Sequence, residues 1–78
     1  MRIRLYTGPN CELCEQAKEL IYPLLTKHLE LQEIDVTQSI ETKKNFGLRI
    51  PVLAREVDDE ELGWPFTANQ LKHFFQIN

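Results

Sequence analysis

The sequence is poor in cysteine, tryptophan, methionine and glycine, with two, one, one and three of these residues among its 78. Its apolar residues form no run long enough to span a membrane, so we expect no membrane partner. No apolar stretch follows a basic segment at the start of the chain, which predicts that there is no signal peptide. We therefore expect a cytoplasmic location.

Basic residues are also scarce, because nine lysines and arginines stand against twelve acidic residues and give a net charge of -3. This balance lacks the positive surface that nucleic-acid binding needs, so we expect no nucleic-acid partner. The dipeptide Lys43-Lys44 is interpreted as a solvated helix face. The acidic run over 58–61 lacks the alternating oxygen ligands of a calcium loop and is interpreted as an exposed turn. His28 and His73 lack the spacing of zinc ligands, and we expect both on the surface and no bound metal.

Apolar residues make up 42% of the chain and charged residues 27%, which is ordinary for a soluble globular protein. A chain of this size builds one hydrophobic core and few elements. We therefore expect a single domain over residues 1–78, with no linker and no internal repeat.

Two strands and a helix are predicted in the first half of the chain. Polar and apolar residues alternate over 2–6, which indicates a strand, and the turn residues Gly8-Pro9-Asn10 follow. Apolar residues at helical spacing over 13–25 predict a helix that kinks or ends early at Pro23. Residues 29–36 predict a second strand, in which a change of phase indicates a bulge or an edge position.

The second half begins with a short polar helix over 37–46, for which Ile40 and Phe46 are the expected anchors. Gly47 is expected to end this helix by adopting a positive φ. A third strand is predicted over 50–54, and a weaker fourth strand follows the acidic turn. Strands so close in sequence should form an antiparallel hairpin.

The last element has the clearest start. Thr67 and Gln70 fit a capping box, and Phe66 and Leu71 fit a hydrophobic staple. The order strand–helix–strand–helix–strand–strand–helix predicts an α/β fold, βαβαββα, whose first two strands are parallel because a helix connects them. The expected architecture is a four-stranded mixed sheet with helices on both faces.

Cys11 and Cys14 are the only cysteines, and they stand where the first helix should begin. They could be a redox pair, half of a metal site or two ordinary thiols. Because cytosolic thiols are kept reduced, a permanent structural disulfide is not expected. As a redox pair, Cys11 would be the attacking thiolate, since backbone N–H groups and the dipole at a helix N-terminus stabilise an anion. Cys14, one turn later and more shielded, would be the resolving thiol.

The stretches "CELC", "RIPVL" and "GWPF" resemble glutaredoxins of the thioredoxin-fold superfamily, and more closely a group of small glutaredoxin-like proteins. The resemblance covers essentially the whole chain and implies the thioredoxin fold at glutaredoxin size. It also implies that the Ile50–Pro51 bond is cis, that Pro51 lies against the cysteine pair, and that the backbone of Ile50 pairs with an extended substrate. From the residues alone a trans bond is commoner, since only about 5–6% of X–Pro bonds in folded proteins are cis.

The chain departs from the glutaredoxin pattern between its cysteines, where Glu12 and Leu13 replace the common proline and tyrosine. A carboxylate at Glu12, together with Glu15, opposes a thiolate at Cys11, and no basic residue closely precedes Cys11. These features predict a thiol that is less acidic than that of typical glutaredoxins.

The glutathione site is also altered, because Gly63 is followed by Trp64, Pro65 and Phe66 rather than by a second glycine and an acidic residue. Thr67 and the backbone N–H groups after it are candidates for binding a carboxylate, and Arg49 and Lys43 for supplying charge near the glycyl end. Solvated surface is the alternative for Arg49 and Lys43. Trp64 lines a groove beside the cysteines or, as we favour, covers the end of the sheet as a partly buried core residue.

These features favour a thiol–disulfide oxidoreductase that uses Cys11 and Cys14 to reduce or exchange protein disulfides or glutathione mixed disulfides. No bound cofactor is expected, glutathione is a candidate reductant or co-substrate, and the physiological reductant is unidentified. We expect a monomer. The alternative is a thioredoxin-fold binding module, either redox-inert or holding a metal or an iron–sulfur cluster through the cysteine pair in a dimer.

Overall fold

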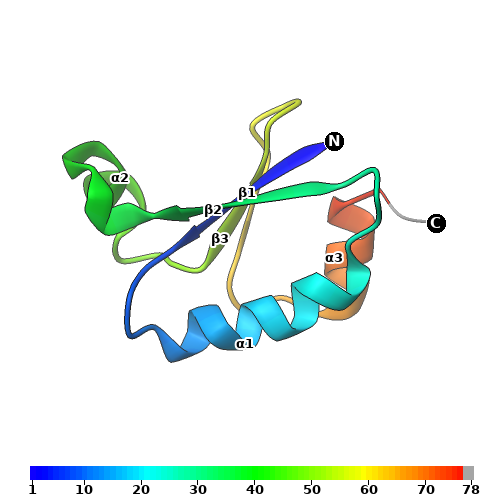
Figure 1. Ribbon diagram of the computed structural model, residues 1–78, viewed down its shortest axis with the longest axis horizontal. Coiled ribbons are helices and arrows are strands. Elements are labelled where there is room, and N and C mark those ends of the chain that lie inside the picture. The colour runs from blue at the N-terminus through cyan, green and yellow to red at the C-terminus, as the bar shows by residue number, and fades with distance from the viewer. Residues whose placement is uncertain (77–78) are drawn as a thin grey trace.

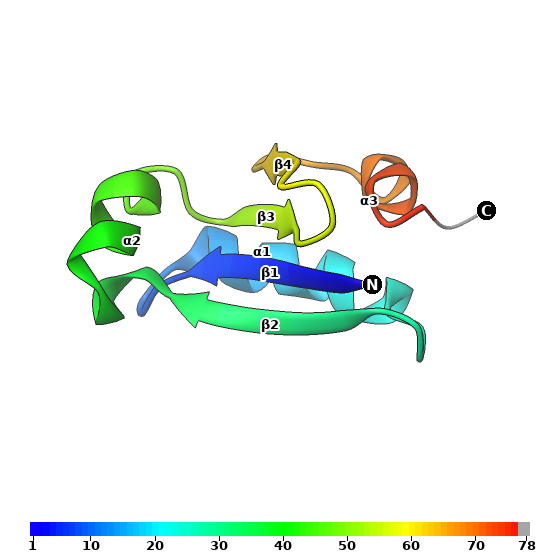
Figure 2. The same ribbon diagram turned by 90° about the horizontal axis from the view of Figure 1, so that it is seen from above.

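Four strands form one mixed sheet in a computed structural model that describes residues 1–76 (Figure 2). The strands are β1 (Arg2–Thr7), β2 (Glu30–Asp35), β3 (Val52–Arg55) and β4 (Glu61–Gly63), and their order in the sheet is β2-β1-β3-β4. β1 is parallel to β2 and antiparallel to β3, and β3 and β4 form an antiparallel hairpin. The predicted mixed sheet is therefore confirmed. β2 is an edge strand, and its register with β1 is unbroken, so the change of phase reflects the edge position and not a bulge.

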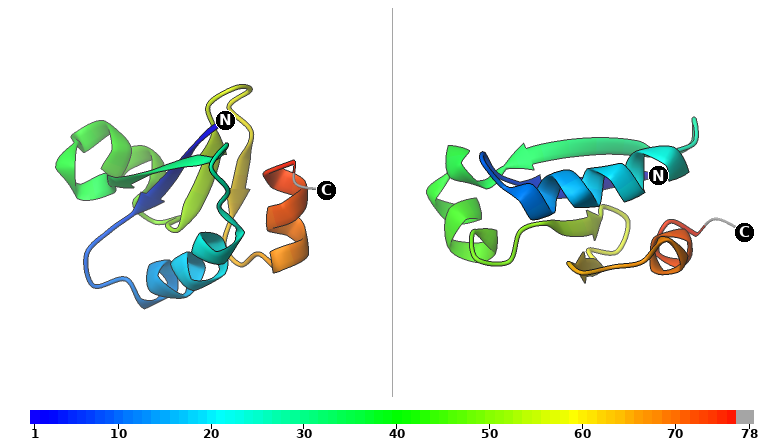
Figure 3. Two further views of the ribbon diagram at one scale, coloured as in Figure 1. Left: turned by 45° about the vertical axis from the view of Figure 1, so that its right-hand side comes forward. Right: turned by 90° about the horizontal axis from the view of Figure 1, so that it is seen from below.

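Three α-helices cover the two faces of the sheet, as predicted (Figure 1). They are α1 (Glu12–Ile21), α2 (Ile40–Phe46) and α3 (Ala68–Phe74), and short 3-10 turns lie at Tyr22–Leu24 and Val36–Gln38. α1 and α3 lie on one face, where they are neighbours, and α2 lies on the other face near one end of the strands (Figure 3). None of the helices described within residues 1–76 combines the length and apolarity that crossing a bilayer requires.

The main hydrophobic core lies between the sheet and the pair α1 and α3. Its buried members come from β1, β3, both helices and the residues that flank α3, which follows from the alternation of each strand and the apolar stripe of each helix. They are Ile3, Leu5, Ala17, Ile21, Leu53, Phe66, Leu71, Phe74 and Phe75. As expected, α1 ends two residues before Pro23, which lies in the 3-10 turn that follows the helix. Thr67 and Gln70 form the predicted capping box of α3.

The opposite face carries a second, smaller cluster around Tyr6, Val36 and Val52. Phe46 at the end of α2 stacks on Tyr6, with ring centroids 3.9 Å apart and the planes 11° from parallel. The expected second anchor is wrong, because the side chain of Ile40 is 90% exposed. Phe46 in the last turn is therefore the apolar anchor of α2, and the hydroxyl of Thr42 adds a hydrogen bond to the carbonyl of Val36.

The helix predicted over 37–46 is divided in two at Ser39, which has an extended backbone and caps α2 by accepting a hydrogen bond from the N–H of Thr42. Gly47 ends α2, as predicted, but its φ is -53°, so the expected positive φ is wrong. The structure gives a different reason for glycine, because a Cβ there would collide with the carbonyl oxygen of Lys43.

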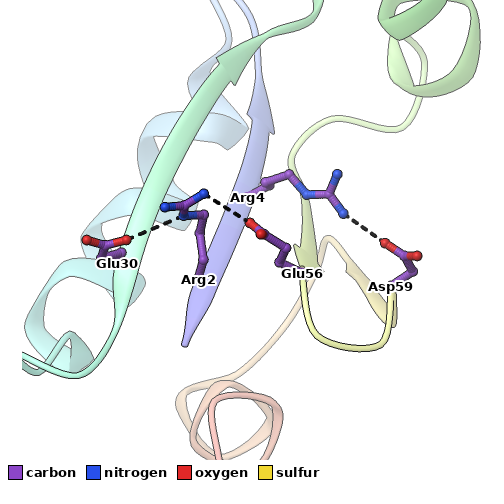
Figure 4. Close-up of polar contacts among 5 residues, drawn as sticks. All are labelled: Arg2, Arg4, Glu30, Glu56 and Asp59. Carbon is purple, nitrogen blue, oxygen red and sulfur yellow. Dashed lines mark hydrogen bonds and ion pairs between the residues drawn. The ribbon is translucent and has the colours of Figure 1, made fainter.

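Ion pairs occupy the part of this face that α2 leaves open (Figure 4). Arg2 and Arg4 alternate with buried residues of β1 and so share the face of Tyr6. Arg2 lies 3.4 Å from Glu30 of β2 and 3.5 Å from Glu56, and Arg4 lies 3.0 Å from Asp59 in the β3–β4 turn. These ion pairs link β1 to β2 on one side and to the β3–β4 turn on the other. Charged groups suit a sheet surface that faces solvent.

The stacking of Phe46 on Tyr6 predicts that Phe46→Ala destabilises the chain by about 2 kcal/mol, because a partly buried ring and its partner contact are lost. Ile40→Ala on the same helix is the matched control and should change the free energy of unfolding by less than about 0.5 kcal/mol. Urea unfolding followed by circular dichroism measures both. Equal losses in the two variants would contradict the assignment of Phe46 as the anchor of α2.

Candidate active site

A tight turn connects β1 to the start of α1. It is formed by Gly8, Pro9 and Asn10, and Asn10 has a φ of 54°, in the left-handed region that asparagine tolerates better than most residues. Cys11 follows with an extended backbone and is the N-cap of α1. The turn thus fixes a sulfur at the position where helices usually place a serine, threonine or aspartate oxygen.

The two cysteines differ in accessibility. Cys11 is partly exposed, whereas Cys14 is only 1% exposed and lies one turn inside α1. The structure joins them in a disulfide, with their Cα atoms 5.2 Å apart. The Sγ of Cys11 accepts a hydrogen bond from the backbone N–H of Cys14 at 3.2 Å. An incoming disulfide can therefore reach Cys11 but not Cys14.

The N-terminus of α1 places partial positive charge next to the Sγ of Cys11. When the disulfide is reduced, the N–H of Cys14 and the positive end of the helix dipole both favour negative charge on the Sγ of Cys11. Glu12 and Glu15 lie in the same turn and oppose that charge, as expected from the sequence. Both are exposed, so water and salt screen their effect.

Lys18 partly offsets these carboxylates from the next turn of α1. Its Nζ lies 3.5 Å from Glu15 and 3.0 Å from Glu33 of β2. The hydroxyl of Tyr22 donates a hydrogen bond to the second carboxylate oxygen of Glu33. This bond, followed by the Lys18 ammonium, holds the pKa of Glu33 below its ordinary range, and Glu33 in turn raises the pKa of Lys18. These contacts form the Glu33 cluster, made of Lys18, Tyr22 and Glu33, which ties α1 and the turn after it to the edge strand β2.

Ile50 and Pro51 lie at the same end of the sheet as the cysteine turn. Tyr6 of β1 is opposite Val52 of β3, so the residues that follow β1 and those that precede β3 emerge together. The predicted cis bond between Ile50 and Pro51 is confirmed. A Cβ on Gly8 would lie 2.9 Å from the Cδ1 of Ile50, which shows how closely the two loops approach. Within residues 1–76, neither the N–H nor the carbonyl of Ile50 has a backbone partner, so both are free to pair with an extended ligand.

Trp64 borders the same end of the sheet. Its backbone N–H donates to the carbonyl of Pro51 at 3.2 Å, and the bond from Trp64 to Pro65 is also cis, which the sequence did not indicate. The indole is partly buried and meets Phe66 edge-to-face, with centroids 5.0 Å apart. This confirms the prediction that Trp64 is a partly buried core residue at the end of the sheet.

Two other candidate residues have most of their polar groups engaged within the protein. The guanidinium of Arg49 donates to the carbonyl of Asn45 and pairs with Glu61 of β4 at 3.2 Å. Thr67 is the N-cap of α3, with its hydroxyl accepting from the N–H of Gln70 and its own N–H donating to that side chain. Their predicted contacts with substrate stay predictions.

A groove that the sequence did not reveal adjoins the cysteine turn. It has a volume of about 460 Å³ and runs between Gly8 and Pro9 on one side and the end of α2 on the other. Leu48 lines it and is fully exposed. The only signal in the sequence was an apolar residue in a predicted loop, which by itself indicates nothing.

No group of three or more His, Cys, Asp or Glu residues within residues 1–76 of one chain is placed to hold an ion. The metal-binding alternative instead uses the cysteine pairs of two chains. His28 and His73 are exposed, as predicted.

Comparison with known proteins gives three findings. Residues 2–76 match the family described as Glutaredoxin-like domain (DUF836). The Glutaredoxin-like protein YDR286C homolog of Dictyostelium discoideum is 42% identical over 41 residues, which cover 46% of this chain and 38% of that protein. The match therefore spans well under half of the relative's length. The X-ray structure of target protein XcR50 from X. campestris is similar over 97% of both chains, with 27% identity and a TM-score of 0.81.

The Glu33 cluster predicts a pH-dependent contribution to stability. Because the folded chain lowers the pKa of Glu33, its contribution is fully present above the ordinary glutamate value of 4.5 and is lost as pH falls through the lowered pKa. Glu33→Gln should therefore lower the free energy of unfolding at pH 7 by about 0.5 kcal/mol, allowing for solvent screening, and the difference from wild type should shrink toward pH 3.

Urea titrations at several pH values between 7 and 3 measure this difference. Glu19→Gln on the exposed side of α1 is the control and should show no such trend. A Glu33→Gln deficit that is the same at both ends of the range would contradict the ionic origin.

Proposed function

The chain belongs to the glutaredoxin-like domain family, and we propose that it is a thiol–disulfide oxidoreductase whose redox centre is Cys11 and Cys14. One observation carries the proposal: an accessible sulfur caps α1, while its partner lies buried one turn later and can form a disulfide with it. The chain is thus a thioredoxin-fold protein of redox type. The specific activity is the part that is proposed.

The proposed reaction begins with the reduced pair. The thiolate of Cys11 attacks one sulfur of a substrate disulfide, forms a mixed disulfide and expels the other sulfur as a thiolate. Cys14 then loses its proton to solvent, attacks the Sγ of Cys11 and releases the second substrate thiolate. The substrate gains two electrons and the protein is left with the Cys11–Cys14 disulfide, which an external thiol must reduce.

Substrate binding is assigned to the loops that surround the pair. The backbone groups of Ile50, which have no backbone partner within residues 1–76, support a role in pairing with an extended chain. Pro51 has no N–H to offer the sulfurs, and its carbonyl accepts the N–H of Trp64. Protein disulfides and glutathione mixed disulfides are the substrate classes, with glutathione as a candidate reductant. The proposed setting is the cytoplasm, with the protein acting as a monomer and without a bound cofactor.

Unequal roles of the cysteines give a direct test. Cys14→Ser should accumulate a stable mixed disulfide when it is mixed with oxidised glutathione or a peptide disulfide, because nothing displaces the substrate from Cys11. Cys11→Ser should form none, since Cys14 is buried. Intact-protein mass under non-reducing conditions detects the adduct, and the mass increase identifies the bound thiol.

Two results would count against the proposal. One is the absence of any adduct on Cys14→Ser at neutral pH. The other is a purified wild-type chain that carries zinc or an iron–sulfur cluster on its thiols and dimerises through it, which would support the metal-binding alternative.

A further inference from the structure

The groove beside the cysteine turn is open and largely apolar. Val36 and Ile50 contribute apolar atoms to it, and Leu48 stands fully exposed at its side. Through Gly8 and Pro9 it adjoins the turn that carries Cys11, and through Ile50 it adjoins the free backbone groups that precede Pro51. A ligand whose sulfur is attacked by Cys11 can therefore extend into the groove.

The charge of the groove is opposite to that of the protein. The chain has a net charge of -3, yet the groove is lined by Lys43 and Lys44 and by no acidic residue. Both lysines are exposed, and neither forms an ion pair within residues 1–76. The groove thus combines an apolar surface with two free positive charges, which is complementary to a ligand that is apolar and anionic.

We propose that the groove selects protein substrates in which apolar and acidic side chains flank the disulfide cysteine. The inference rests on the proposed oxidoreductase function and names its substrate class. The apolar side chain contacts Leu48 and Ile50, and the carboxylate lies near Lys43 and Lys44. Glutathione fits this surface less well, because its glycyl residue has no side chain to cover Leu48.

The selected substrate enters the same reaction. Cys11 attacks the sulfur of the substrate cysteine, its disulfide partner leaves as a thiolate, and Cys14 then releases the substrate as a free thiol. The groove acts only on binding before the first attack. It therefore changes the rate at which the mixed disulfide forms. The products of the reaction stay the same.

Four chromogenic probes test the proposal, each a mixed disulfide with thionitrobenzoate. Three are end-blocked pentapeptides, Glu-Leu-Cys-Leu-Glu, Gln-Leu-Cys-Leu-Gln and Glu-Ala-Cys-Ala-Glu, and the fourth is glutathione. Reduced protein is mixed with each probe, thionitrobenzoate release is followed by absorbance, and each rate is divided by the rate of the same probe with dithiothreitol. This division removes differences in the intrinsic reactivity of the probes.

The Glu-Leu peptide should react roughly fivefold faster than the Gln-Leu peptide, because its two carboxylates form screened charge pairs with the lysines of the groove. It should react roughly tenfold faster than the Glu-Ala peptide, because its leucine side chains are partly buried in the groove. It should also exceed glutathione. The charge preference should weaken in high salt.

Matched variants locate the preference. The double variant Lys43→Gln/Lys44→Gln should abolish the charge preference, and Leu48→Ser should reduce the apolar one. Lys27→Gln/Lys72→Gln replaces two other exposed lysines, and Val57→Ser another exposed apolar residue, so both controls should keep the wild-type ratios.

The outcomes separate this inference from the proposed function. Equal normalised rates for all four probes, or preferences that survive the groove variants, would overturn the assignment of the groove and leave the oxidoreductase function standing. Failure of the wild-type chain to release thionitrobenzoate from any probe would overturn both.

Discussion

The hydrogen bond from the N–H of Cys14 to the Sγ of Cys11 is the interaction on which the proposed chemistry of this protein depends. It makes a cysteine the cap of α1, so the sulfur that faces solvent also receives the partial positive charge of the helix. The next turn of the same helix buries the second sulfur within reach of the first. One helix start therefore provides partial positive charge for one sulfur, access to it, and a second, buried sulfur within reach.

The rest of the fold holds this helix start near the loop before β3, for which substrate binding is proposed. β1 and β3 are neighbours in the sheet, and the turn after β1 packs on Ile50 just before β3. Packing against the main core holds α1 on the sheet, and the ion pair of Lys18 with Glu33 ties α1 to β2. α2 is held by Phe46 stacked on Tyr6 and by the hydroxyl of Thr42, which donates to the carbonyl of Val36. Its C-terminal half borders the groove. The buried core thus underlies the helix that carries the cysteines, and the more polar helix α2 lies beside the groove for which substrate selection is proposed.

Periodicity and local capping signals were sufficient for the architecture. Local signals predicted the elements: the alternation in β1, the apolar spacing of α1, Pro23 after it, and the Thr67–Gln70 capping box. The resemblance to glutaredoxins added the prediction of a cis bond before Pro51. Features that depend on how distant segments meet were not accessible. Ile40 and Phe46 look alike in sequence, but only the chain path brings Phe46 to Tyr6. The pairing of Arg49 with Glu61 and the exposure of Leu48 beside two lysines likewise arise only when α2, β4 and the cysteine turn are placed together.

The most direct test of the account is a redox titration of the purified protein in glutathione buffers, with thiols alkylated and the products weighed by mass spectrometry. A dithiol redox centre predicts a reversible two-electron couple. Cys11 and Cys14 should both be alkylated at reducing potentials and both protected at oxidising ones, with one transition between them. A pair that stays reduced across the whole range, or that is protected by bound metal, would contradict a dithiol redox centre at the start of α1.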